Sequence, residues 1–321
     1  MRLARRAMLP LLAAPLVARA QADWPRETIR WILPYAAGGP TDLIARIVAE
    51  RLSQSLPQRV VVENRAGAGG NIGAAAVARA APDGHTWLFH NTGLAVARAL
   101  FRTLDYDPER DLVPVTVLAE SPMVMLVPAT SPDRSVADFI ARARANPGRL
   151  TYASSGTGGA LQLVTLLLIR AARIQIEEVS YRGSAPAYQD LIAGRLDLLY
   201  DAALSALPQA AQGQVRALAV SSAQRSRAAP ELPTIGEAGF PDATFSVWQA
   251  LLAPRATPAP ILARMQAAIA AVLAEPAIVT RLTELGAERL IGNSVADANT
   301  TITAEITRWT TVLRDAGVQP Q

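Results

Sequence analysis

Short apolar strands alternate with helical stretches along most of the chain, and glycine-rich turns stand between them. Such a repeat predicts a mostly parallel sheet with helices on its faces. A strand at Thr28–Pro34 is followed by the turn Ala36-Ala37-Gly38-Gly39 and a helix at Thr41–Ser53. Much later, a strand at Leu150–Ala153 leads through the glycine turn Ser154–Gly159 into another helix. The sequence therefore predicts an α/β fold built from two similar units.

Two apolar stretches are suited to connect these units. The run Val113–Val127 is broken at Glu120-Ser121-Pro122, as expected for a strand that leaves one domain and enters another, and a return crossing is predicted near Val247–Leu252. We expect residues 1–22 to be a signal peptide, residues 23–120 and 250–321 the first domain, and residues 121–249 the second. Two crossings form a hinge, and ligands of open α/β sheets bind beyond the carboxyl ends of the strands.

Further elements are predicted at Val60–Val62, Asn71–Ala80, Thr86–Phe89, Ser135–Ala145, Ala160–Arg170, Glu177–Ser180, Leu196–Tyr200, Val215–Val220 and, mostly as helix, beyond Pro260.

Composition excludes several kinds of chemistry. The 321 residues include no lysine and no cysteine, which removes Schiff bases, a phosphate-loop lysine, thiol nucleophiles and disulfides. The two histidines, His85 and His90, do not form a zinc motif, so we expect no metal and no cofactor. The formal charge of +4 comes from interleaved arginines and acids rather than a basic run, so nucleic acid is not an expected partner.

The N-terminus has the pattern of an export signal. A basic stretch, Met1–Arg6, precedes the apolar run Ala7–Val17, and small residues then allow cleavage after Ala20 or Ala22. The Arg5-Arg6 pair is compatible with both the general secretory and the twin-arginine route. A membrane anchor is the alternative, but the apolar run is too short to span a bilayer of about 30 Å.

The turns at Gly38 and Gly158 are candidate anion-binding loops. Each places glycine-rich backbone just before a helix, where unpaired amides and the helix dipole favour a negative charge. The alternative is that the glycines only permit tight turns. Pro40 suits the first helical position, and Asp42 in the first turn suits a structural cap better than direct contact with an anion.

Other motifs of the sequence do not match dinucleotide-binding or hydrolase patterns. Gly67–Ile72 fails the dinucleotide fingerprint at its sixth position, and Ser154-Ser155-Gly156 lacks the glycine of a nucleophile elbow. A catalytic triad would have to form across the cleft. Arg182 could pair with a carboxylate, although a surface arginine is the commoner case. Asp201, expected to end a strand, is either a ligand contact or a helix cap, and Trp248 either lines the cleft or packs the crossing strand.

A series of motifs runs in order along nearly the whole mature chain. They are Pro34–Asp42, Val61–Gly73, Ala81–Gly84, Tyr106-Asp107-Pro108, Tyr152–Gly156, Tyr181–Ala187 and Leu251–Pro254. With these motifs the chain resembles the Bug family of extracytoplasmic receptors, the substrate-binding proteins of tripartite tricarboxylate transporters. The resemblance implies a two-domain periplasmic-binding-protein fold of the Venus-flytrap, type II-like kind, with a carboxylate held between the domains.

The resemblance also implies a set of ligand-binding residues. In such proteins, loops of the first domain bind one carboxylate, partly through water, and loops of the second domain bind the rest of the ligand. The matching positions here are Tyr35, Ala37, Gly38, Gly39, Thr41, Asp42, Asn91, Thr92, Gly93, Ser154, Ser155, Gly156, Thr157, Gly158, Gly159, Tyr181, Arg182, Gly183 and Asp201. Departures from the family pattern are Pro40, Gln162, Ala202 and Ala97-Arg98, and they bear on which ligand is bound.

These observations predict a monomeric periplasmic receptor that captures a small organic carboxylate and catalyses no reaction. Its expected partners are the membrane subunits of a tripartite tricarboxylate-type transporter. A sensor that presents its ligand to a signalling kinase and an enzyme that uses the same cleft remain alternatives. Because Pro40 lacks an amide donor, we expect the Gly38 loop to bind more through water, and the Gly158 loop with Asp201 to select the carboxylate.

Overall fold

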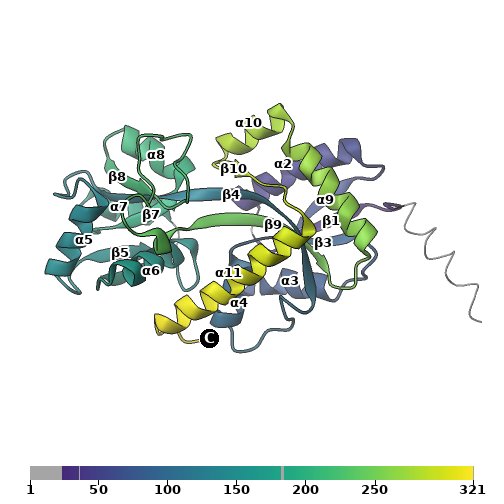
Figure 1. Ribbon diagram of the computed structural model, residues 1–321, viewed down its shortest axis with the longest axis horizontal. Helices are drawn as coiled ribbons and strands as arrows, with labels where there is room; N and C mark the ends of the chain where they lie inside the picture. Colours follow the sequence, from purple (N-terminus) through teal and green to yellow (C-terminus); the bar gives the residue numbers. More distant parts are fainter. Residues whose placement is uncertain (1–23, 36, 182–183, 321) are drawn as a thin grey trace, which may run out of the picture.

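Two α/β lobes lie side by side in the computed structural model, which describes residues 24–35, 37–181 and 184–320 (Figure 1). The strands β4 (Leu112–Pro128) and β9 (Ser246–Pro254) run through both lobes and pair with each other antiparallel. The α/β architecture with two crossings is therefore confirmed. The predicted mostly parallel sheet is wrong, because every pairing made by β4 and β9 is antiparallel and only β1–β2, β1–β3 and β5–β6 are parallel strand pairs. The exact division at residues 120/121 and 249/250 stays a prediction, and both points fall inside the crossing strands.

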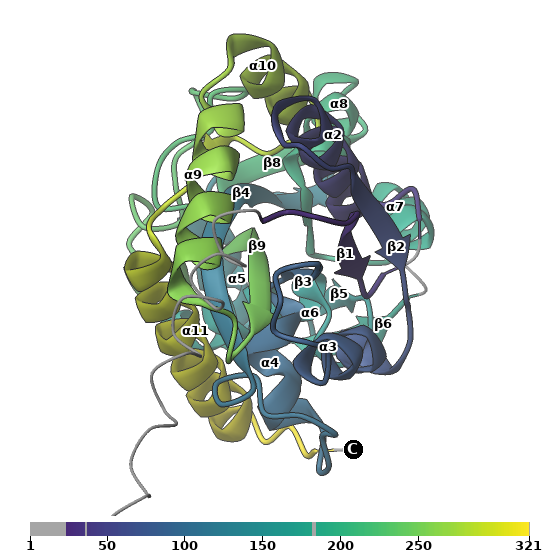
Figure 2. The same ribbon diagram turned by 90° about the vertical axis from the view of Figure 1, so that its right-hand side faces the viewer.

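The first lobe is a six-stranded arrangement in the order β10-β4-β9-β3-β1-β2, in which β2, β1 and β3 are parallel. In Figure 2, α2 and α9 flank this sheet on one side, and α3 and α4 lie on the other. The bounds of its elements are β1 (Ile29–Leu33), α2 (Pro40–Ser55), β2 (Val60–Asn64), η1 (Ala68–Gly70), α3 (Asn71–Ala78), β3 (Thr86–Asn91), α4 (Gly93–Leu100), α9 (Ala259–Leu273), α10 (Pro276–Glu284), β10 (Arg289–Leu290) and α11 (Val295–Asp315).

The second lobe repeats the strand–turn–helix plan. The strands β7 and β8 pair with β4, while β5 and β6 form a parallel pair. The bounds of its elements are α5 (Val136–Ala145), β5 (Thr151–Ser154), α6 (Ala160–Ala172), β6 (Glu177–Ser180), α7 (Ser184–Ile192), β7 (Leu199–Ala202), α8 (Ala203–Ala211), β8 (Val215–Val220) and η2 (Pro241–Ala243).

Strand β4 is the predicted crossing strand, and it continues through Glu120-Ser121-Pro122 as one strand of 17 residues. Pro122 lies where the partners of β4 change: β10 pairs up to Glu120, and β7 begins to pair at Met123. A proline lacks the N–H that a ladder needs, so this changeover is a position where a strand tolerates it. The strand predicted at Leu196–Tyr200 has different bounds in the structure. It runs from Leu199 to Ala202, so Asp201 lies inside the strand.

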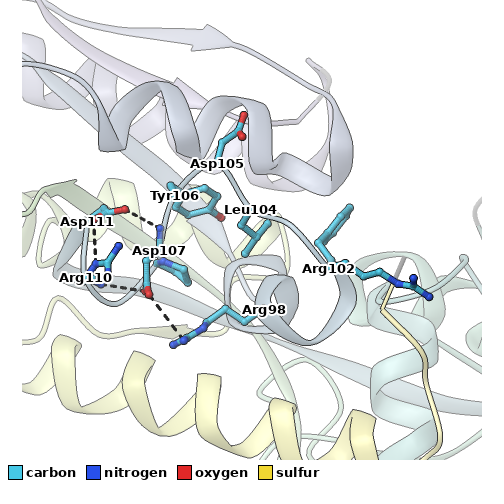
Figure 3. Close-up of a pocket in the computed structure, with 10 residues that line it drawn as sticks. Arg98, Arg102, Leu104, Asp105, Tyr106, Asp107, Arg110 and Asp111 are labelled. Atoms are coloured by element: carbon cyan, nitrogen blue, oxygen red, sulfur yellow. Dashed lines mark hydrogen bonds and ion pairs between the residues drawn. The ribbon is translucent and has the colours of Figure 1, made fainter.

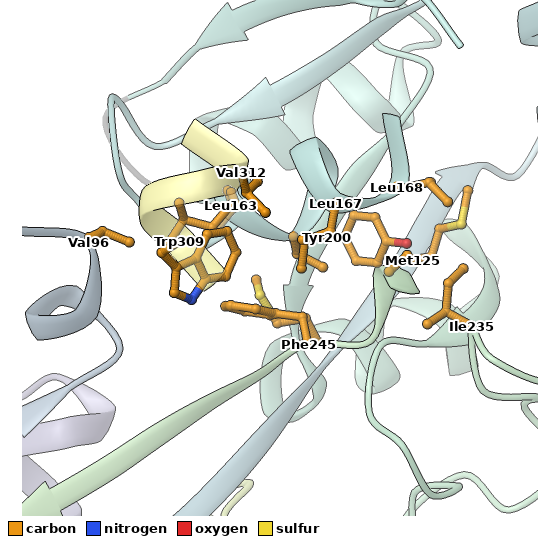
Figure 4. Packing of buried hydrophobic residues seen from close by; sticks show 14 of the residues in the cluster. Val96, Met125, Leu163, Leu167, Leu168, Tyr200, Ile235, Phe245, Trp309 and Val312 are labelled. Atoms are coloured by element: carbon orange, nitrogen blue, oxygen red, sulfur yellow. The ribbon is translucent and has the colours of Figure 1, made fainter. Parts of the chain in front are cut away.

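Helix α11 connects the two lobes. Its N-cap Ser294 accepts a hydrogen bond from the Asp297 amide, and its Trp309 packs edge-on against Phe245 with ring centroids 5.7 Å apart. Figure 4 shows Trp309 beside Leu163 of α6, and both belong to one buried cluster that also contains Val96 of α4. One hydrophobic core thus extends through both lobes, and a second core lies between α2, α9 and the first-lobe sheet.

Candidate functional site

The turns of both lobes meet around a cavity of about 430 Å³ between them. The first lobe contributes the ends of β1 and β3 and the Gly67–Gly70 turn, the second lobe contributes the turn before α6, and Val247 comes from the crossing strand. The lining residues are Pro34, Tyr35, Ala66, Gly67, Gly69, Gly70, Asn91, Thr92, Gly93, Ser155, Thr157, Gly158, Gly159, Ala160, Leu163 and Val247. Eight of these belong to the predicted ligand-binding set, from both lobes, and none is charged.

The Gly38 turn is held together from within. Pro40 starts α2, as predicted, and Gly38 adopts a φ of +86°, which favours glycine. Its amide donates to the Asp42 carboxylate at 3.0 Å, and Asp42 also accepts from Arg46 and from Asn64, each at 2.9 Å. Burial of the carboxyl group raises the pKa of Asp42, but these hydrogen bonds outweigh burial and hold the pKa below its usual value. Asp42 therefore acts as the structural cap of the turn, and the Gly38 amide already has an acceptor.

A polar network at the end of β3 forms the first-lobe wall of the cavity. The Tyr35 hydroxyl donates to Asn91 Oδ1 at 2.5 Å and lies 3.0 Å from His90 Nδ1. Asn91 Oδ1 also accepts from the Gly93 amide at 2.9 Å, and its Nδ2 donates to the Thr41 hydroxyl at 3.3 Å. Thr41 itself does not line the cavity, but this contact ties α2 to the β3 loop.

His90 belongs to this network, although its sequence context indicates only that it forms no zinc motif. It is fully enclosed, and burial lowers its pKa to about 4 despite an opposing hydrogen bond with the Asn91 backbone. A Cβ at Gly70 would lie 2.9 Å from His90 Nε2, so the absence of a side chain at Gly70 leaves room for the imidazole ring. Strand β3 is buried on both faces from Trp87 to His90, so strand periodicity gives no signal for the role of His90.

The Gly158 turn uses the same device with a neutral side chain. The Gly158 amide donates to Gln162 Oε1 at 2.8 Å, and Gln162 Nε2 donates to Glu178 at 2.9 Å. The Tyr152 hydroxyl also donates to Glu178, at 2.9 Å. The amide expected to grip an anion is therefore engaged by Gln162, a residue noted from sequence only as a departure from the family. The hydroxyls of Ser155 and Thr157 remain on the cavity wall.

Gly158 is also a contact between the lobes. A Cβ built there would lie 2.0 Å from Leu100 Cδ1, at the end of the first-lobe helix α4. A side chain at this position would require Leu100 to change its rotamer or the lobes to move apart, so glycine suits this contact best. Gly39, by contrast, has nothing within 4 Å of its Cβ position.

Other predicted residues lie beside the cavity rather than on it. Asp201 is buried in β7 and accepts from the Ser205 hydroxyl of α8 at 2.5 Å, but α8 begins without a side-chain cap, so this contact is not the predicted helix cap. Ser154 is buried, and the Tyr181 hydroxyl donates to Asp190 at 2.8 Å. Trp248 packs in the core while its backbone amide donates to the Thr92 hydroxyl at 3.1 Å. The remaining predicted positions outside the cavity lining are Ala37, Gly38, Gly39, Asp42 and Gly156, while Arg182 and Gly183 lie outside the described residues.

A separate pocket of about 380 Å³ lies below α4 and holds several charged residues (Figure 3). Its aspartates are already engaged: Asp105 with Arg79 at 3.7 Å, Asp107 with Arg98 at 3.8 Å, and Asp111 with the Asp107 amide at 2.8 Å. Mutual neutralisation of this kind leaves little charge for a ligand, so the interlobe cavity is the stronger candidate.

Metal binding and membrane insertion are two further properties that bear on the site. No group of three or more histidine or acidic side chains that could hold a metal ion occurs in that part of the chain. No single described helix is long and apolar enough to cross a membrane, while α9 and α10 pass the test together but meet at a bend of 80°.

Comparisons with known proteins place this site in context. The profile of the tripartite tricarboxylate transporter family receptor matches residues 44–318. The protein BugT of Bordetella pertussis is 34% identical over 312 residues, which cover 96% of this chain and 95% of that protein. Rpa4515 of R. palustris, solved with adipate, is 38% identical with a TM-score of 0.78, covering 93% of this chain and 100% of the other. MatC (Rpa3494) from Rhodopseudomonas palustris, solved with bound malate, is 34% identical with a TM-score of 0.74, covering 90% and 100%.

Proposed function

Because this chain belongs to the family of tripartite tricarboxylate transporter receptors, we propose that it is a periplasmic receptor for a small organic carboxylate. It would pass this ligand to the membrane subunits of a transporter of the same kind and catalyse no reaction. The carboxylate class is supported by the similar proteins that carry adipate and malate.

The observation that carries the proposal is the cavity itself, which both lobes line with neutral donors at helix N-termini. Helix α3 starts directly after Gly70, α4 starts at Gly93 and α6 starts at Ala160, and these three residues lie on the cavity wall. The positive ends of the helix dipoles favour an anion there. Such a wall attracts a carboxylate although no charged side chain of the described residues lines it.

Hydroxyl groups supply the remaining donors. Thr92 accepts from the Trp248 amide, which leaves its own proton to donate, and Ser155 and Thr157 face the same space from the second lobe. Hydrogen bonds to a charged acceptor contribute about 1.5 to 3 kcal/mol each. A ligand that bridges Thr92 and Thr157 would therefore stabilise the closed arrangement of the lobes.

A thermal-shift panel of mono-, di- and aromatic carboxylates, with native mass spectrometry of the purified protein, tests the proposal. We expect at least one carboxylate to raise the melting temperature, and Thr157→Val to weaken its binding about tenfold. A protein that responded to neutral compounds and to none of the acids would contradict it. Uptake into vesicles that contain the membrane subunits separates transport from sensing.

The export signal can be tested separately. The predicted cleavage after Ala20 or Ala22 concerns residues outside the described part of the chain, and N-terminal sequencing of protein from the periplasm would identify the site. Retention of residues 1–22 in mature protein would favour a membrane anchor instead.

A further inference from the structure

A second groove, of about 310 Å³, lies between the lobes next to the crossing strands. It is lined by Ser246 of β9, whereas the neighbouring residue Val247 lines the ligand cavity. Successive side chains of a strand point to opposite faces. The groove and the ligand cavity therefore lie on opposite faces of the hinge, and we call the former the hinge groove.

Both lobes build the walls of the hinge groove. The loop after β8 contributes Arg225 and Arg227, and the segment after α10 contributes Glu288 and Arg289. Glu288 accepts from the Ser226 hydroxyl at 2.5 Å and from the Arg227 amide at 3.1 Å, so it joins the first lobe to the second. Any change in the angle between the lobes must alter the shape of this groove.

Two of the three arginines that line the hinge groove are ion-paired, while the Glu288 carboxylate is held by two neutral donors. Arg289 lies 3.3 Å from Glu120, Arg225 pairs with Glu237 at 2.9 Å, and Glu288 is engaged as described above. The guanidinium of Arg227 meets no acceptor among residues 24–35, 37–181 and 184–320. One cation in the groove is therefore available to an incoming anion.

Part of the remaining wall is apolar, and Ser222, Gln224, Ser246 and Thr283 add neutral polar groups to it. Leu273 of α9, Val279 of α10 and Leu290 of β10 line it together with Pro122 of β4. Apolar surface favours a compact hydrocarbon body, and a planar carboxylate matches the fork of a guanidinium. The combination suits a small carboxylate with an aromatic or branched apolar body better than an inorganic anion.

We propose that the hinge groove is a second ligand site, which binds a small apolar monocarboxylate at Arg227 and thereby favours the lobe arrangement in which the groove has this shape. Opening the cleft on one face of the crossing strands changes the groove on the other face. An occupant of the groove consequently raises the affinity of the ligand cavity, and by linkage the cavity ligand raises the affinity of the groove by the same factor. The groove binds its own ligand whether or not the cavity binds a carboxylate.

Calorimetric titration of the full mature protein with benzoate tests this site. We expect binding that weakens at least tenfold in Arg227→Gln and is unchanged in Arg149→Gln, a matched control at an exposed arginine of the same lobe. The cavity variants Asn91→Ala and Thr157→Val should retain benzoate binding, and neutral benzamide should bind at least tenfold more weakly. Each variant is first checked for an unchanged far-UV spectrum and a cooperative melt.

Loss of benzoate binding in both cavity variants, with Arg227→Gln unaffected, would overturn the proposal, because benzoate would then occupy the ligand cavity. Complete absence of benzoate binding would overturn it as well. If the carboxylate panel finds no cavity ligand while benzoate binds through Arg227, the proposed function fails and the hinge groove stands. If a cavity ligand is found, saturating benzoate should tighten it severalfold in wild type and leave it unchanged in Arg227→Gln.

Discussion

The Gly38 turn and the Gly158 turn are built alike, yet they differ in what surrounds them. In each, the glycine amide donates to a side chain four residues later, Asp42 in the first lobe and Gln162 in the second. Beside Gly38 there is open space, whereas beside Gly158 a Cβ would lie 2.0 Å from Leu100. The first glycine is thus needed for its backbone conformation alone, and the second also for the approach of the lobes.

The largest effect is expected from Gly158→Ala. The added methyl group overlaps Leu100 Cδ1, so either Leu100 changes its rotamer within a packed contact or the lobes move apart. We expect the closed state to be disfavoured and ligand affinity to fall about 100-fold, while each lobe stays folded. Calorimetry and small-angle scattering measure the two consequences. The double variant Gly158→Ala, Leu100→Ala should recover part of the affinity, since it removes the clash and leaves only backbone strain. No recovery would mean that strain at the turn, rather than the lobe contact, causes the loss.

The next largest effects are expected from removing the side chains that accept from the two glycine amides, Asp42 and Gln162. Asp42→Ala leaves the Gly38 amide without a partner and removes one of the two acceptors of Asn64 Nδ2, and we expect a loss of about 2 to 3 kcal/mol in the free energy of unfolding. Gln162→Ala frees the Gly158 amide and one contact of Glu178, at an expected cost of about 1 to 2 kcal/mol. Urea unfolding of both variants measures these losses. A larger loss of unfolding free energy in Gln162→Ala than in Asp42→Ala would contradict the prediction.

The lobes should also differ in their response to pH, because both histidines lie in the first lobe. Burial lowers the pKa of His90 to about 4, from an ordinary value of 6.5, so the unfolded chain binds the proton more tightly. Its contribution is present above pH 6.5 and is lost as the pH falls toward 4, by about 2 kcal/mol at pH 5. We expect His90→Gln to be less stable than wild type at pH 7.5 but to lose less stability between pH 7.5 and 5. Parallel pH profiles for the two proteins would argue against a buried neutral histidine.

The smallest effect is expected from Gly38→Ala. The substitution meets no atom within 4 Å but must adopt a φ of +86°, which costs about 1 to 2 kcal/mol for an alanine. Ligand affinity should change less than threefold, because the lobes can still close. An affinity loss as large as that of Gly158→Ala would end the distinction between the turns.

Several elements were predictable because their signals are local. Pro40 at the first position of α2 and Asp42 as its cap follow from rules about helix starts, and the structure places both as expected. Helices α4, α7 and α8 were not assigned from sequence. Helix α4 begins without a side-chain cap, and Pro208 lies inside α8, so these segments lack the usual start signals or contain a breaker.

The candidate site was predictable only in part. The turns that line the cavity were identified from their glycines and from the family resemblance. Which of their amides remain free was not, because Gln162 reaches Gly158 only once α6 is formed and Glu178 of β6 orients its amide. His90 and Leu100 were missed for the same reason: their importance lies in contacts with Tyr35 and Gly158, which are distant in sequence.

The sequence by itself determined the α/β plan, the two crossings and the glycine turns, because strand periodicity and backbone conformation depend on neighbouring residues. Only the tertiary structure decided that the Gly38 and Gly158 amides are already engaged, that Gly158 is a contact between the lobes, and that Arg227 lies in the hinge groove without an acceptor among the described residues. Each of these depends on pairs of groups brought together by the packing of two lobes, and no local pattern encodes such a distance.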